Sequence, residues 1–204
     1  QSALLEAMQE RQVTIGDHTY KLEEPFLVLA TQNPIEQEGT YELPEAQVDR
    51  FMLKVFMGYP SKQEEQLILR SNVRPEGLEK ISHVMNPGDL IKGKQLARSI
   101  YLDEKVERYI VDIVDATRNP ATAGVSEISK YLLYGASPRA SINLALAAKA
   151  NAFLEQRGFV IPDDVRTVAM DVLRHRVGLN YEAEADGVKP EQIIERLLQR
   201  VEVP

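Results

Sequence analysis

The sequence predicts an α/β segment over residues 1–58, followed by an all-helical part over residues 59–204. The α/β segment is indicated by a hairpin pattern at 13–22 and by a continuous apolar run at 26–30, which is typical of a parallel strand buried on both faces. The helical part begins after Gly58-Tyr59-Pro60, where capping residues and apolar positions recur at helical spacing. Apolar residues make up 44% of the 204 positions, which is enough to build a core.

The α/β segment divides into short elements. Residues 1–12 carry apolar side chains at helical spacing with no capping residue ahead of them, so we expect the chain to be a fragment of a longer protein. In the hairpin, Gly16-Asp17 supplies the turn. A proline ends the apolar run, and a polar loop is expected at 35–43. A short helix is predicted at 44–51, and a short strand-like stretch follows at 52–57.

Five helices are predicted in the second part. Ser61 and Glu64 form a capping box at the start of the first, and the second ends at the Asn119-Pro120 pair. Residues 73–101 are expected to be less regular, and residues 121–136 to form a loop with one short helical patch. The predicted helices span 61–72, 103–118, 137–158, 162–178 and 190–201.

Composition excludes several kinds of site. The chain has no cysteine, which rules out disulfides, thiolate metal ligands and a cysteine nucleophile. Its three histidines, His18, His83 and His175, are 65 and 92 positions apart, so a three-histidine zinc site is not expected. We therefore predict no metal site built from these residue types.

The charge distribution argues against a nucleic-acid partner. The net charge is −7, of which residues 1–60 contribute −6 and residues 61–204 contribute −1. Binding to a phosphate backbone needs a basic excess, which neither part has. No apolar run approaches 18 residues, so no membrane span is predicted, and no signal-peptide pattern opens the sequence.

One segment matches a phosphate-loop motif only in its spacing. Residues 88–95, GDLIKGKQ, satisfy G-x-x-x-x-G-K, but they end on Gln95 instead of Ser or Thr and follow no buried strand. The carboxylates of 111–116 lie in a helical pattern instead of closing an apolar strand. We interpret 88–95 as a solvated, lysine-rich loop.

Asn33 is the first candidate site residue. It follows the predicted strand at 26–30, and ligands of parallel α/β sheets bind beyond the carboxyl ends of the strands. Its amide offers a donor and an acceptor, which could orient a water molecule against a terminal phosphate. The alternative is that Asn33 only caps the turn before Pro34.

Arg50 is the second candidate, at the end of the predicted helix 44–51. An arginine that reaches the nucleotide of a neighbouring subunit accelerates phosphoryl transfer by several orders of magnitude. The alternative is an ion pair within the chain, to Asp49 or Glu45.

Arg139 is the third candidate, at the second position of the predicted helix 137–158. The helix dipole disfavours a cation in the first turn, so an arginine there suggests an anionic partner such as a phosphate. The alternative is a surface arginine that simply tolerates its position.

Three blocks of the sequence resemble the MoxR family of AAA+ ATPases. They are QSALLEAMQERQVTI at the start, PFLVLATQNPIEQEGTYELPEAQVDRFMLKV in the middle, and GASPRASINLALAAKA with PDDVRTVAMDVLRHRV toward the end. The resemblance covers essentially the whole chain, and the 31-residue middle block is far more specific than a short motif.

The resemblance implies a partial AAA+ core of the P-loop NTPase type, with a β-hairpin and a parallel-sheet remnant at 1–58, and a helical AAA+ lid at 59–204. It implies that Asn33 is the sensor-one residue, that Arg50 is an arginine finger across a subunit interface, and that Arg139 is the sensor-two arginine, in cis or in trans. It further implies ATP and Mg²⁺ as cofactors and a cytoplasmic, hexameric ring that remodels client proteins, among them partners with von Willebrand A domains.

One departure from the family is large. Family members carry a Walker A loop and a Walker B Asp-Glu pair ahead of the segment with which this sequence starts, and neither is in the 204 residues. We therefore expect ATP hydrolysis by the longer parent and none by this fragment alone.

The alternative is a non-catalytic helical protein-interaction module, which fits 59–204 but leaves the hairpin, Asn33 and Arg50 without a purpose. The acidic balance disfavours a third reading, a DNA-remodelling relative.

Overall fold

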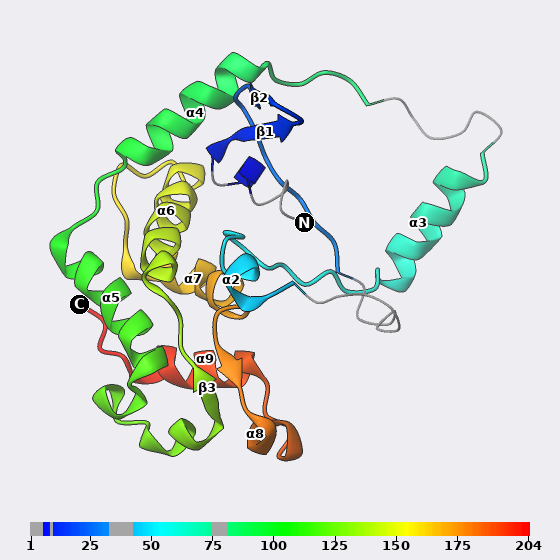
Figure 1. The fold of residues 1–204 in the computed structure, drawn as a ribbon. Helices are drawn as coiled ribbons and strands as arrows, with labels where there is room; N and C mark the ends of the chain where they lie inside the picture. Colours follow the sequence, from blue (N-terminus) through cyan, green and yellow to red (C-terminus); the bar gives the residue numbers. More distant parts are fainter. Residues whose placement is uncertain (1–5, 9, 33–42, 75–80) are drawn as a thin grey trace.

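The computed structural model describes residues 6–8, 10–32, 43–74 and 81–204. It consists of a hairpin near the N-terminus, extended connecting segments and a helical body (Figure 1). The helices are α2 Glu45–Val48, α3 Lys62–Asn72, α4 Pro87–Ser99, α5 Glu104–Arg118, α6 Pro138–Leu154, α7 Pro162–Leu173, α8 Tyr181–Ala185 and α9 Pro190–Arg200, with the 3₁₀ helices η1 Pro120–Ala123 and η2 Ser126–Tyr131. The strands are β1 Gln12–Ile15, β2 His18–Lys21, β3 Leu132–Tyr134 and β4 Gly178–Leu179.

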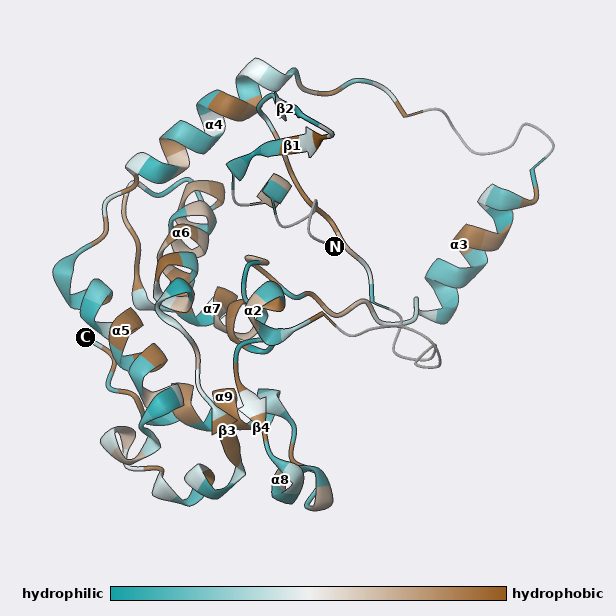
Figure 2. Cartoon of the chain, viewed as in Figure 1, coloured by the Kyte–Doolittle hydropathy of each residue, from teal (hydrophilic) through white to brown (hydrophobic). Residues whose placement is uncertain are grey.

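The core lies in the helical body. Helix α6 packs along α7 and also contacts α4 and α5, while α9 closes the body against α5 and α7. Figure 2 shows apolar stretches on α5 and α9, and the buried residues of both helices recur at helical spacing. Fully buried side chains such as Ile113, Leu144 and Leu173 join these helices into one cluster. Among the described residues, no helix is long and apolar enough to cross a membrane.

The predicted hairpin is confirmed. Strands β1 and β2 pair antiparallel, with Val13 opposite Tyr20. Gly16 has a φ of +62°, a conformation that glycine adopts without steric cost, so the turn lies where the sequence predicts it. A second antiparallel pair, β3 with β4, joins the chain before α6 to the chain after α7.

The parallel strand predicted at 26–30 is not found. These residues are extended but belong to no sheet, and Leu27 and Leu29 are 77% and 86% exposed. A parallel strand needs neighbouring strands to pair its backbone N–H and C=O groups, and no strand of the described chain pairs with these residues. The strand-like stretch at 52–57 is likewise extended outside any sheet.

The five predicted helices are confirmed, but two end earlier than predicted. The predicted capping box is present, with Ser61 accepting a hydrogen bond from the Glu64 N–H. Helix α6 ends at Leu154, because Gln156 adopts a left-handed φ of 57° that interrupts the helix. Helix α7 ends at Leu173, where the chain turns toward β4.

Helix α4 corrects the prediction for residues 73–101, and it contains the 88–95 motif. Asn86 caps this helix by accepting a hydrogen bond from the Asp89 N–H at 3.0 Å, and Pro87 occupies its first position. The motif is therefore helical and not a loop. No residue of α4 is buried. The helix was not predicted because its sequence does not show the apolar stripe that marks a packed helix.

Candidate functional site

The turn after α2 places Arg50. The Asp49 N–H bonds to the Glu45 carbonyl at 2.9 Å and the Arg50 N–H bonds to the Gln47 carbonyl at 3.2 Å, so the helical turn continues to Arg50. The half-buried Arg50 side chain turns back and donates a hydrogen bond to the Ala46 carbonyl. The guanidinium group is thus held beside α2.

The start of α6 places Arg139, and it is anchored to the end of α5. Ser137 caps the helix by accepting a hydrogen bond from the Arg139 N–H at 3.2 Å. One residue earlier, the buried Ala136 N–H donates to the Thr117 hydroxyl at 2.9 Å. Gly135 approaches α5 so closely that a Cβ atom there would lie 2.4 Å from the Thr117 carbonyl oxygen. These contacts fix where the first turn of α6, and with it Arg139, begins.

Asp49 joins the α2 turn to the helical body. Its Oδ2 accepts hydrogen bonds from the Ser137 hydroxyl at 2.9 Å and from Arg139 Nη1 at 3.3 Å. Its Oδ1 accepts a hydrogen bond from Arg176 Nε at 2.9 Å. Burial by itself raises the pKa of Asp49, but the hydrogen bonds from Ser137, Arg176 and Arg139 outweigh it and leave the pKa below the ordinary value of 3.8. The carboxylate is therefore ionised at neutral pH.

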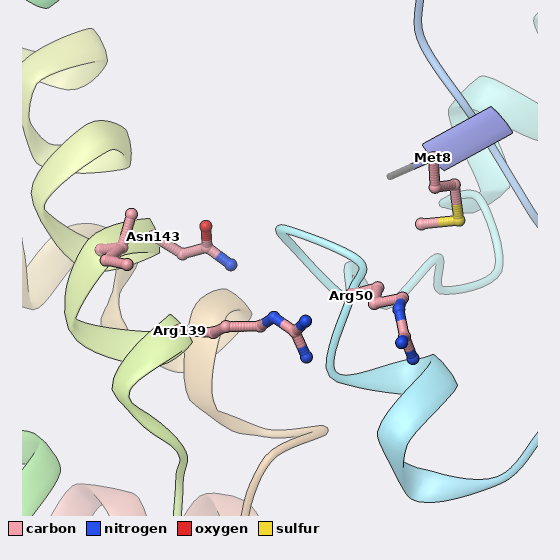
Figure 3. Close-up of a pocket in the computed structure, with 5 residues that line it drawn as sticks. Met8, Arg50, Arg139 and Asn143 are labelled. Carbon is pink, nitrogen blue, oxygen red and sulfur yellow. The ribbon is translucent and has the colours of Figure 1, made fainter. Parts of the chain in front are cut away.

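A pocket of about 210 Å³ lies between these two segments. Figure 3 shows Arg139 and Asn143 reaching in from one helix, Arg50 from the turn after α2, and Met8 from the N-terminal helical turn. Ile142 completes the lining. The lining suits a ligand that carries phosphate, because each guanidinium group can donate two parallel hydrogen bonds to two oxygens of one phosphate. It provides two guanidinium groups, one amide and two apolar side chains.

Comparisons with known proteins identify the family of the chain. Residues 1–53 match the family model described as "ATPase family associated with various cellular activities (AAA)", and residues 126–197 match the "AAA lid domain". The chain is 47% identical to "Chaperone MoxR1" of Mycobacterium tuberculosis and 43% identical to the Bacillus subtilis protein YeaC, each over 100% of this chain. The chain belongs to the MoxR family of AAA+ ATPases. A crystal structure of a candidate ATPase from Cytophaga hutchinsonii superposes with a TM-score of 0.95 at 49% identity.

This MoxR-family chain spans only part of the length of its relatives. It covers 54% of the Mycobacterium tuberculosis protein and 61% of the Bacillus subtilis protein. It covers 62% of the Cytophaga hutchinsonii chain, although that structure matches all of this one.

The structure brings together two of the three residues predicted for the MoxR site. Arg50 and Arg139 line one pocket, whereas Asn33 lies outside the described residues. Arg139 pairs with Asp49 of the same chain at 3.3 Å, and the phosphate contact predicted for Arg139 stays a prediction. Asp49, one of the two possible ion-pair partners of Arg50 in the sequence, forms ion pairs with Arg139 and Arg176.

Sequence reasoning missed Asn143 and Arg176. Asn143 lies one helical turn after Arg139, so the i, i+4 spacing on a predicted helix could have pointed to it. Arg176 left no such signal, because four of its five acceptors lie more than 120 positions away and its burial follows from tertiary packing.

Proposed function

We propose that the chain is the C-terminal part of the AAA+ core and the lid of a MoxR-type ATPase, which couples ATP hydrolysis to the remodelling of partner proteins. The observation that carries the proposal is the convergence of Arg50 and Arg139 on one pocket, although they lie far apart in the sequence. Both belong to blocks that the AAA family models match. The division into a core portion at 1–58 and a lid at 59–204 is part of the proposal, and each of the two matches, at 1–53 and 126–197, falls within one of these parts.

The proposed roles follow from the chemistry of each side chain. Arg50 acts as the arginine finger, which neutralises charge that develops on the transferred phosphoryl group. Arg139 acts as the sensor-two arginine and binds phosphate oxygens, in its own subunit or a neighbouring one. Asn33 acts as the sensor-one residue and orients the attacking water. A phosphate at Arg139 would compete with the Asp49 carboxylate, so nucleotide binding would loosen the Asp49–Arg139 pair.

ATP is the substrate in this proposal, and Mg²⁺ would neutralise charge on its phosphates. The described residues contain no group of three or more His, Asp or Glu side chains that could hold a metal ion. We therefore assign none of the described residues to Mg²⁺.

For the whole protein, we propose a homo-hexameric ring that acts in the cytoplasm. Proteins with von Willebrand A domains are the proposed clients. The chaperone name of the Mycobacterium tuberculosis relative and the candidate ATPase assignment of the Cytophaga hutchinsonii structure support this class of activity.

Steady-state ATP hydrolysis by the protein at its natural length tests the proposal. Arg50→Ala should lower kcat by about 10³-fold or more, the range typical of arginine fingers. Arg139→Ala should mainly raise KM for ATP, since it removes a phosphate contact. Arg108→Ala is the matched control, because Arg108 is 67% exposed on α5 and pairs only loosely with Glu104 at 3.9 Å.

The outcomes separate the proposal from its alternative. Wild-type protein that neither binds nor hydrolyses ATP would favour a non-catalytic helical interaction module. Hydrolysis that survives Arg50→Ala would refute the finger role while leaving the ATPase itself in place.

A further inference from the structure

Arg176 is a fully buried arginine whose donors are all used. Its side chain is 0% exposed. Nε donates to Asp49 Oδ1 at 2.9 Å, and Nη2 donates to the backbone carbonyls of Asp49 at 2.9 Å and Phe51 at 2.6 Å. Nη1 donates to the Met52 carbonyl at 3.2 Å and to the Val172 carbonyl. A guanidinium group has five N–H donors, and these contacts supply five acceptors.

Four of these five acceptors belong to the residues on either side of Arg50. Burying a charge is unfavourable unless it is paired and hydrogen-bonded, so the arrangement is stable only while the backbone from Asp49 to Met52 keeps this path. The planar fork of an arginine fixes the relative positions of its acceptors, which a lysine ammonium cannot do. The backbone that carries Arg50 is therefore held from the lid side.

Two further contacts attach the residues after Arg50 to the C-terminal end of α7. His175 Nε2 lies 3.0 Å from the Phe51 carbonyl oxygen. The Lys54 N–H donates to the Asp171 carbonyl at 2.8 Å. The chain after α2 thus lies against residues 171–176, which follow or end α7.

Asp49 extends this contact to Arg139. One carboxylate oxygen accepts from Arg176, and the other accepts from Ser137 and Arg139 at the start of α6. One buried guanidinium therefore touches the backbone around Arg50 directly and Arg139 through a single carboxylate.

We propose that Arg176 is a positioning residue for the proposed ATPase site, which sets the place of Arg50 and, through Asp49, that of Arg139. This inference rests on the proposed function, because positioning has a catalytic consequence only if Arg50 acts on a nucleotide. Displacing a catalytic group by about 1 Å can lower a rate by 10²-fold. Arg176 bonds directly to the residues next to Arg50 but reaches Arg139 only through Asp49, so its loss should lower kcat more than it raises KM for ATP.

The experiment compares Arg176→Lys and Arg176→Met with wild type in ATP hydrolysis, using the protein at its natural length. Arg176→Lys keeps the positive charge but not the fork, and kcat should fall by about 10- to 100-fold while KM stays within about threefold. In hydrogen exchange, the amides of residues 49–51 should exchange at least about tenfold faster in the variant.

Arg174→Met is the matched control. Arg174 also lies just past α7, with a side chain that is 10% exposed, but it pairs with Asp171 at 2.8 Å and stacks 4.3 Å from the Phe56 ring centre. Its removal should lower stability without changing kcat or the exchange of residues 49–51.

The results distinguish failure of the positioning role of Arg176 from failure of the proposed ATPase function. Full kcat in Arg176→Lys, together with a large loss in Arg50→Ala, would overturn the positioning role and leave the proposed function intact. A wild type without hydrolysis would instead overturn the proposed function. Wild-type exchange provides a test that needs no folded variant: amides of residues 49–51 that exchange much faster than those of α7 would overturn the inference.

Discussion

Thr117→Val tests how the start of α6, and therefore Arg139, is held in place. The Thr117 side chain is fully buried. Its hydroxyl accepts from the Ala136 N–H at 2.9 Å and donates to the Val114 carbonyl at 2.6 Å. Valine has the same shape but cannot accept a hydrogen bond, so the substitution leaves one buried N–H unpaired.

The magnitude follows from these contacts. A buried donor left without a partner costs about 1–3 kcal/mol. The bond to Val114 matters less, because that carbonyl lies within the hydrogen-bonded ladder of α5. The added methyl group recovers up to about 0.8 kcal/mol through its burial. We therefore expect the free energy of unfolding to fall by about 1–2 kcal/mol.

Urea unfolding followed by circular dichroism measures this change, with the m-value used to check that the unfolding transition is otherwise the same. Thr167→Val is the control, because the Thr167 hydroxyl bonds the Asp163 carbonyl at 2.9 Å on an exposed face of α7. The control should change stability by less than about 0.5 kcal/mol. An equally small loss in Thr117→Val would refute the anchoring of α6 through this hydroxyl.

Three further predictions concern packing and ionisation. Gly135→Ala should lower stability by about 1–3 kcal/mol in urea unfolding, because its Cβ would lie 2.4 Å from the carbonyl oxygen and 2.6 Å from the carbonyl carbon of Thr117, whereas Gly158→Ala meets nothing within 4 Å and should be tolerated. Burial lowers the pKa of His175 from 6.5 to about 4, so the folded protein disfavours protonation of this side chain, and its contribution to stability is complete only above pH 6.5. Between pH 7 and 5 the free energy of unfolding should therefore fall by about 1–2 kcal/mol. His175→Gln should remove this part of the pH dependence of stability. Asp164 is 2% exposed, and although burial raises its pKa, hydrogen bonds from an arginine, a backbone N–H and an asparagine bring it below 3.8. Asp164→Asn should therefore cost about 2–3 kcal/mol at pH 7, and its difference from wild type should vanish as acid protonates the wild-type carboxyl well below pH 4; a pH-independent difference would contradict this.

Local chemistry made several elements predictable. The β1–β2 hairpin follows from a glycine turn between alternating residues, and both signals act within ten positions. The helix starts at Ser61, Asp103 and Ser137 follow from side chains that accept hydrogen bonds from the first turn. Capping depends on residues two or three positions away, so it can be predicted without knowledge of the tertiary structure.

Predictions that needed distant partners were less successful. The apolar run at 26–30 has the composition of a buried strand, yet it lies in no sheet of the described chain, because a strand exists only where another strand pairs with it. Helix α4 was missed for the opposite reason, since none of its residues is buried and its sequence carries no apolar stripe.

For the candidate site, the sequence by itself determined which residue types are available and where on their helices they lie: Arg50 after a short helix and Arg139 in a first turn. Only the tertiary structure decided that these two line one pocket, that Asp49 pairs with Arg139, and that Arg176 is buried against the turn carrying Arg50. The physical reason is that periodicity and capping report on a few neighbouring residues, whereas the desolvation and pairing of a charge depend on which distant segments the assembled core brings into contact.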